Sequence, residues 1–85
     1  MPYIKPEHRE RLFTLVGEII SNPANSPGEL NYLITSMCHV YLHNKGESYQ
    51  AYNDIIGALE GSKLEIYRRE VSPYEDRKIL ENGDV

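Results

Sequence analysis

The chain has 85 residues, a mass of 9.8 kDa and a net charge of −4, and its length predicts a single domain over residues 1–85, for which the patterns below predict helices. The acidic balance excludes a protein that binds nucleic acid non-specifically by charge. The single cysteine excludes an internal disulfide, and the opening residues form no apolar run, so we expect a cytoplasmic protein without a signal peptide, a membrane span or a membrane partner.

The first predicted helix covers residues 6–21. Pro6 suits the first turn of a helix, because its missing N–H would have had no helical partner there. The residue before a proline is disfavoured in helical geometry, so Asn22, which precedes Pro23, ends the helix. Five apolar side chains recur at the spacing of one buried helical face: Leu12, Leu15, Val16, Ile19 and Ile20.

The second predicted helix covers residues 27–43. Ser26 is a capping residue, and Pro27 takes the first helical position. Glu29 can reach back to the N–H of Ser26 and close a capping box. Gly46 suits the left-handed conformation that follows a helix end. The apolar stripe of this helix consists of Leu30, Leu33, Ile34, Met37, Cys38 and Tyr41.

The third predicted helix begins after Ser48 and covers residues 49–69. Gly57 and Gly61 lie in its interior, where each glycine costs about 1 kcal/mol relative to alanine. Close approach of another backbone, from this chain or from a partner copy, is expected to offset that cost. The main apolar stripe of the helix consists of Tyr52, Ile55, Ile56, Leu59, Ile66 and Tyr67.

The capping pattern is repeated at Ser72, Pro73 and Glu75, which predicts a short helix over residues 73–81 that ends at Asn82 and Gly83. The alternative is one long third helix kinked at Pro73. Because no alternating strand pattern is present, the sequence predicts an all-α fold, a small bundle of three main helices plus a short C-terminal helix.

Seven tyrosines against one phenylalanine and no tryptophan suggest half-buried surfaces, since the tyrosine ring is apolar and its hydroxyl needs a partner. A chain this small has little interior of its own. We therefore expect a homo-oligomer, with a closed dimer as the commonest form. The residues predicted for its interface are Tyr52, Gly57 and Gly61.

Four residues near the end of the third helix form a candidate site for an anion such as a nucleotide: Lys63, Tyr67, Arg68 and Arg69. Lys63 lies on the apolar stripe, where Glu60 one turn earlier is a suitable partner. Glu65 can pair with either arginine. The competing interpretation is that the cations pair inside the chain and dock its C-terminal segment through Glu75, Asp76 or Glu81.

The remaining patterns give weak signals for chemistry. His39 and His43 have the spacing of metal ligands, with Cys38 beside them, but no further ligand motif accompanies them, so no metal and no cofactor are expected. The alternative to a non-catalytic protein is an all-α, magnesium-dependent nucleotide pyrophosphohydrolase. Its only candidate ligands are Asp54, Glu60 and Glu65, whose spacing scatters them around the helix.

Three stretches carry a family resemblance: GALEGSKLEIYRREVSPYEDRKILENGDV (57–85), MPYIKPEHRERL (1–12) and GELNYLIT (28–35). They resemble a family of small proteins from prokaryotic and phage genomes whose domain has no assigned function. The resemblance implies a compact helical protein, often phage-borne and then located in the host cytoplasm, and it supplies no catalytic residues. The resulting hypothesis is a self-associating, non-catalytic protein that binds an anionic small molecule or a host protein. A subunit that acts only through protein–protein contacts is a further alternative.

Overall fold

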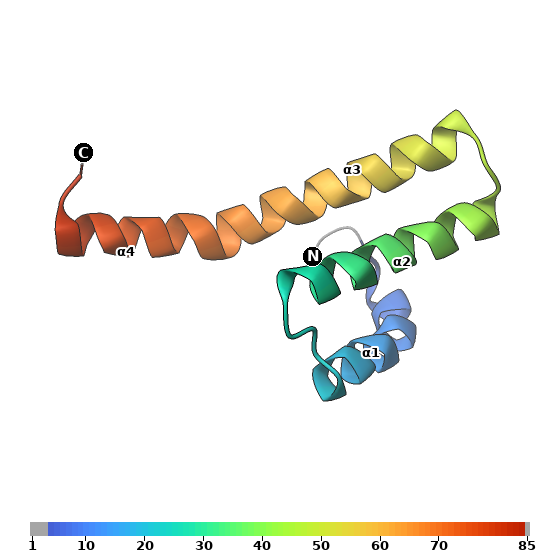
Figure 1. Cartoon of the computed structure of the whole chain (residues 1–85), viewed down its shortest axis with the longest axis horizontal. Coiled ribbons are helices and arrows are strands. Elements are labelled where there is room, and N and C mark those ends of the chain that lie inside the picture. Colours follow the sequence, from blue (N-terminus) through green and yellow to red (C-terminus); the bar gives the residue numbers. More distant parts are fainter. Residues whose placement is uncertain (1–3, 85) are drawn as a thin grey trace. The chain divides into compact units, whose positions relative to one another are not determined.

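The computed structural model describes residues 4–84, and within this range the regular elements are all helical, with no strand. The predicted all-α class is therefore confirmed. Residues 1–3 and 85, which belong to the stretches that carry the resemblance, lie outside the described range. In chain order the elements are α1 (Pro6–Ser21), α2 (Pro27–Lys45), α3 (Tyr49–Ile66), the π-helical turn η1 (Tyr67–Val71) and α4 (Ser72–Asn82). Figure 1 labels the α-helices.

The chain divides into two compact units between Met37 and Cys38. In the first unit, α1 begins and ends where the sequence predicts, and the start of α2 is capped. The Glu29 N–H donates to Ser26 Oγ over 3.1 Å, as predicted. The second hydrogen bond of the predicted capping box has a different donor. Glu29 Oε1 accepts from the N–H of Asn25 at 2.8 Å and not from that of Ser26. The single domain and the bundle arrangement stay predictions.

In the second unit, the end of α2 and the start of α3 form a helical hairpin. Gly46 has a φ of +86°, which a glycine adopts without strain, and α2 ends at Lys45, two residues later than predicted. Ser48 is extended and its Oγ accepts from the N–H of Ala51 at 3.0 Å, so α3 begins where expected. Ala51 is 2% exposed and is the only buried residue among those described.

Helix α3 continues through η1 into α4 without a break, so the long-helix alternative is the correct one for this part of the chain (Figure 1). The predicted helix start at Ser72 was wrong. Its φ of −60° and ψ of −47° are helical, whereas a capping residue is extended. The predicted stop at Gly83 is confirmed, since its φ is +81° and its N–H donates to the carbonyl of Ile79 at 2.8 Å.

Pro73 gives a physical reason for the π-helical turn. In a regular α-helix its ring would collide with the carbonyl of Arg69, and it has no N–H to offer. In η1 the N–H of Ser72 donates to the carbonyl of Tyr67, five residues earlier, which is the wider π pattern. The π turn accommodates Pro73 within a continuous helix. For this reason the predicted helix boundary between residues 69 and 73 is absent.

Candidate functional site

The four predicted anion-binding residues lie together where α3 passes into η1. Lys63 is exposed and pairs with Glu60, its predicted partner, with 3.1 Å between Nζ and Oε1. Both side chains are more than half exposed, so this ion pair adds little to stability. Lys63 therefore has an internal partner that a ligand can displace at low cost.

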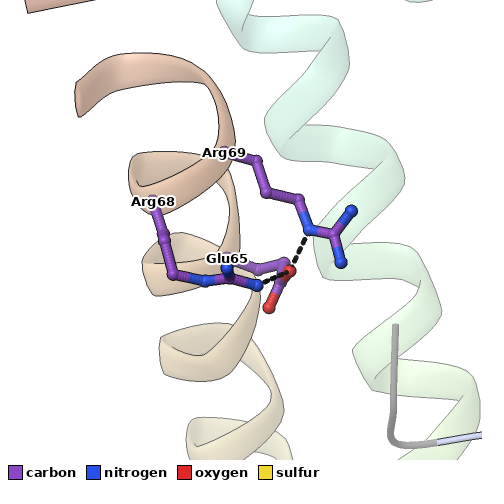
Figure 2. Close-up of polar contacts among 3 residues, drawn as sticks. All are labelled: Glu65, Arg68 and Arg69. Atoms are coloured by element: carbon purple, nitrogen blue, oxygen red, sulfur yellow. Dashed lines mark hydrogen bonds and ion pairs between the residues drawn. The ribbon is translucent and has the colours of Figure 1, made fainter. Parts of the chain in front are cut away.

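Arg68 and Arg69 converge on a single carboxylate oxygen, Oε1 of Glu65 (Figure 2). The distance from Arg68 Nη2 to this oxygen is 2.8 Å, and Arg69 donates to it through Nε. The Glu65 side chain is only 11% exposed. The hydrogen bond from Arg69 and the charges of both arginines hold the pKa of Glu65 below its ordinary value, against an opposing effect of partial desolvation. Glu65 thus stays ionised to lower pH than a free glutamate does.

Tyr67 has a different partner from the arginines beside it. Its hydroxyl donates to Glu75 Oε1 over 3.0 Å, which joins η1 to the first turn of α4. This bond raises the pKa of Tyr67, and the negative charge of Glu75 acts in the same direction. Three carboxylates were considered as partners through which the cations dock the C-terminal segment. Of these, Glu75 bonds to Tyr67 and Glu81 pairs with Lys78 at 3.1 Å. The carboxylate that both arginines contact is Glu65.

This geometry defines what the cluster can do chemically. Two guanidinium groups that meet at one carboxylate oxygen can also meet at one oxygen of a phosphate or a foreign carboxylate. Glu65 occupies one N–H group of each arginine, so it competes with such a ligand for the two cations. The role of Lys63, Tyr67, Arg68 and Arg69 in binding an anion stays a prediction.

The three residues predicted for an oligomer interface do not share one face of α3. At about 100° per residue, Gly61 lies on the side of the helix opposite Tyr52, and Gly57 lies near Gly61. The Tyr52 hydroxyl donates to Glu47. No atom comes within 4 Å of where a Cβ would stand on either glycine. Within the described part of the second unit, therefore, no other backbone makes the close approach offered to explain these glycines.

Comparison with known proteins confirms the resemblance to a family whose domain has no assigned function. The whole chain, residues 1–85, matches a family described as a domain of unknown function, DUF6899. The chain belongs to the DUF6899 family. No curated protein and no solved structure matches this DUF6899 chain. None of the helices described for it is long and apolar enough to cross a membrane.

The carboxylates considered for a hydrolase site have separate partners in this DUF6899 protein. Asp54 accepts from the Tyr41 hydroxyl at 2.8 Å and from Gln50 Nε2 at 2.7 Å, and the Tyr41 bond is the main cause of its lowered pKa. Glu60 and Glu65 bind cations of their own chain. Across residues 4–84, no three His, Cys, Asp or Glu side chains lie close enough together to hold a metal ion.

The contact between Tyr41 and Asp54 was missed in the sequence. It joins α2 to α3 across the hairpin, and the two residues are 13 apart. One signal could have revealed it, because Gly46 and Ser48 define a short turn and the two side chains lie at similar distances on either side of it. Residues placed in this way in antiparallel helices come to the same level.

Proposed function

We propose that this DUF6899 protein acts by binding rather than by catalysis, and that it associates with itself. The observation that supports this proposal is the exposure of large apolar side chains along its helices. In α1, the stripe expected to be buried is instead exposed at Leu15, Val16, Ile19 and Ile20. A contiguous exposed apolar surface of this kind is typical of interaction sites in soluble proteins.

The first test of this proposal is a mass measurement by light scattering on the intact chain at high micromolar concentration. We expect about 20 kDa, twice the mass of the 9.8 kDa chain, or a higher multiple. A mass that stays near 10 kDa over the whole concentration range would remove self-association from the proposed function.

A second binding function is favoured by the convergence of Arg68 and Arg69 on one carboxylate. In this proposal the two arginines bind a phosphate oxygen of a nucleotide-like ligand, and Lys63 and Tyr67 lie beside that oxygen. A host protein that presents a carboxylate in the same place is the other partner class. Since Glu65 occupies the two arginines, it competes with any such ligand.

Variants of the cluster test the anion site, with ADP as the probe in a calorimetric titration. We expect Glu65→Gln to tighten ADP binding several-fold, because it removes the competing charge while keeping the shape. Arg68→Ala with Arg69→Ala should weaken binding at least about tenfold, in line with the strength of charge-assisted hydrogen bonds. Arg77→Ala, which removes an arginine on α4 that contacts the ring of Tyr74, is the matched control and should leave binding unchanged. Equal affinity in all variants would eliminate this site.

A further inference from the structure

Helices α2 and α3 are joined across their turn by a side-chain hydrogen bond that lies within the second unit. The Tyr41 hydroxyl donates to Asp54 Oδ2 over 2.8 Å, and Gln50 Nε2 donates to the other oxygen of the same carboxylate at 2.7 Å. The ammonium nitrogen of Lys45 lies 5.8 Å from the centre of the Tyr41 ring. The Tyr41–Asp54 bond therefore identifies the side of each helix that is turned toward the other.

The side of α3 that carries Asp54 is lined with small residues. At about 100° per residue, the members of residues 51–61 that lie within about 60° of Asp54 are Ala51, Gly57, Ala58 and Gly61. Ala51, next to the turn, is 2% exposed. Farther along, no atom lies within 4 Å of where a Cβ would stand on Gly57 or Gly61. In the second unit this small-residue side is thus covered beside the turn and open beyond it.

The side of α2 that carries Tyr41 is apolar. Leu30, Ile34, Met37 and Cys38 all lie within about 60° of Tyr41 on this continuous helix. Leu30 and Met37 are more than half exposed. Short side chains on one helix let the axis of a neighbouring helix come close, so larger apolar side chains on that neighbour are buried between the two.

We infer that the turn between α2 and α3 is a hinge, and that α2 closes along the small-residue side of α3 with the Tyr41–Asp54 bond setting the register. Residues equally far from the turn come to the same level in antiparallel helices. With Tyr41 opposite Asp54, closure brings Cys38 beside Ala58. Gly46, whose φ is +86°, lies in the turn at the end of α2, where a hinge absorbs changes in backbone angles.

The covalent link favours α2 over a second copy as the helix that covers this side. A segment held by a short turn meets its neighbour at an effective concentration far above that of a separate chain. The hydrogen bond from Tyr41 already holds the two helices at one level. Because Ala51 and Ala58 belong to the same side, closure requires short side chains there and not glycine at every position.

Disulfide formation with the natural Cys38 tests the closure. We expect Ala58→Cys to form a disulfide within one chain at least about tenfold faster than Ile56→Cys, when each is oxidised with diamide at about 1 µM. Ile56 is the matched control, since it lies at nearly the same level on the opposite side of α3. Both substituted residues are exposed, and circular dichroism shows whether each reduced variant is as helical as the natural chain.

Mass spectrometry of the oxidised chains separates linkage within one chain from linkage between two. Only linkage within one chain is counted, so the result does not depend on the proposed self-association. Equal rates for Ala58→Cys and Ile56→Cys, or disulfides only between chains, would overturn the closure.

A second pair of variants tests the bond that sets the register, in the chain that carries Cys38 and Ala58→Cys. Tyr41→Phe keeps the ring and removes the hydroxyl that Asp54 accepts from, so it should slow disulfide formation several-fold. Tyr52→Phe removes a hydroxyl that donates to Glu47, close by in the same turn region, and should leave the rate unchanged. A rate that Tyr41→Phe does not lower, or that both variants lower equally, would overturn the role of the Tyr41–Asp54 bond.

Discussion

The unfolding midpoint of the DUF6899 protein is expected to rise with its concentration. The long helix and α1 each carry apolar side chains that are exposed in the unit to which they belong, so under the proposed self-association much of the stabilising burial should form on assembly. For a dimer that unfolds to two chains, a hundredfold dilution lowers the apparent free energy of unfolding by about 2.7 kcal/mol of dimer. This effect is a large share of the stability of a domain this size.

Chemical denaturation followed by circular dichroism at about 1 µM and about 100 µM measures this dependence. A natural chain whose midpoint does not change with dilution would show that each copy is stable alone. The exposed apolar side chains would then need another explanation.

Most of the helix ends could be predicted because the signals for them are local. Pro6 and Asn22 bound α1 at the predicted residues. Ser48 caps α3, and Gly46 and Gly83 adopt positive φ after α2 and α4. Each of these signals acts within about one helical turn, through a missing N–H, a capping oxygen or a permissive backbone. Sequence therefore specifies them without knowledge of the rest of the fold.

The repeated Ser-Pro-x-Glu pattern shows where local signals fail. Ser26 follows a short segment with its own proline and asparagines, so α2 has to begin there. Ser72 instead follows directly on helical residues, among which two arginines pair with Glu65 one turn earlier. Ending the helix at Ser72 would leave carbonyls of that turn without partners, whereas a single π turn accommodates Pro73 and keeps most of them bonded.

The contacts within the candidate site could likewise be predicted from the sequence only where they lie within about one helical turn. The pairs that are three or four residues apart, Lys63 with Glu60 and Arg68 and Arg69 with Glu65, follow from helical spacing. The bond between Tyr67 and Glu75 depends on α3 and α4 being one helix, and that continuity was only the alternative prediction. Which apolar faces are covered depends on contacts beyond one helical turn, and the spacing of residues within one helix does not encode those contacts.

Replacing both interior glycines of α3 by alanine is expected to stabilise the protein by about 2 kcal/mol of chain. Each glycine costs about 1 kcal/mol relative to alanine in a helix, and neither Gly57 nor Gly61 has an atom within 4 Å of the added methyl group. Denaturation of the double variant at one fixed protein concentration measures the gain. Gly46→Ala is the control and should destabilise by about 1 kcal/mol, because at a φ of +86° a Cβ is strained.

The mass of the double alanine variant tests the interface predicted at these glycines. If copies meet backbone to backbone at Gly57 and Gly61, the two added methyl groups hold the helices apart. The variant would then dissociate, and the helix propensity gained would be offset by the lost contact. If copies meet at another face, the variant keeps the mass of the natural chain while it gains stability, and this result would remove the two glycines from the predicted interface.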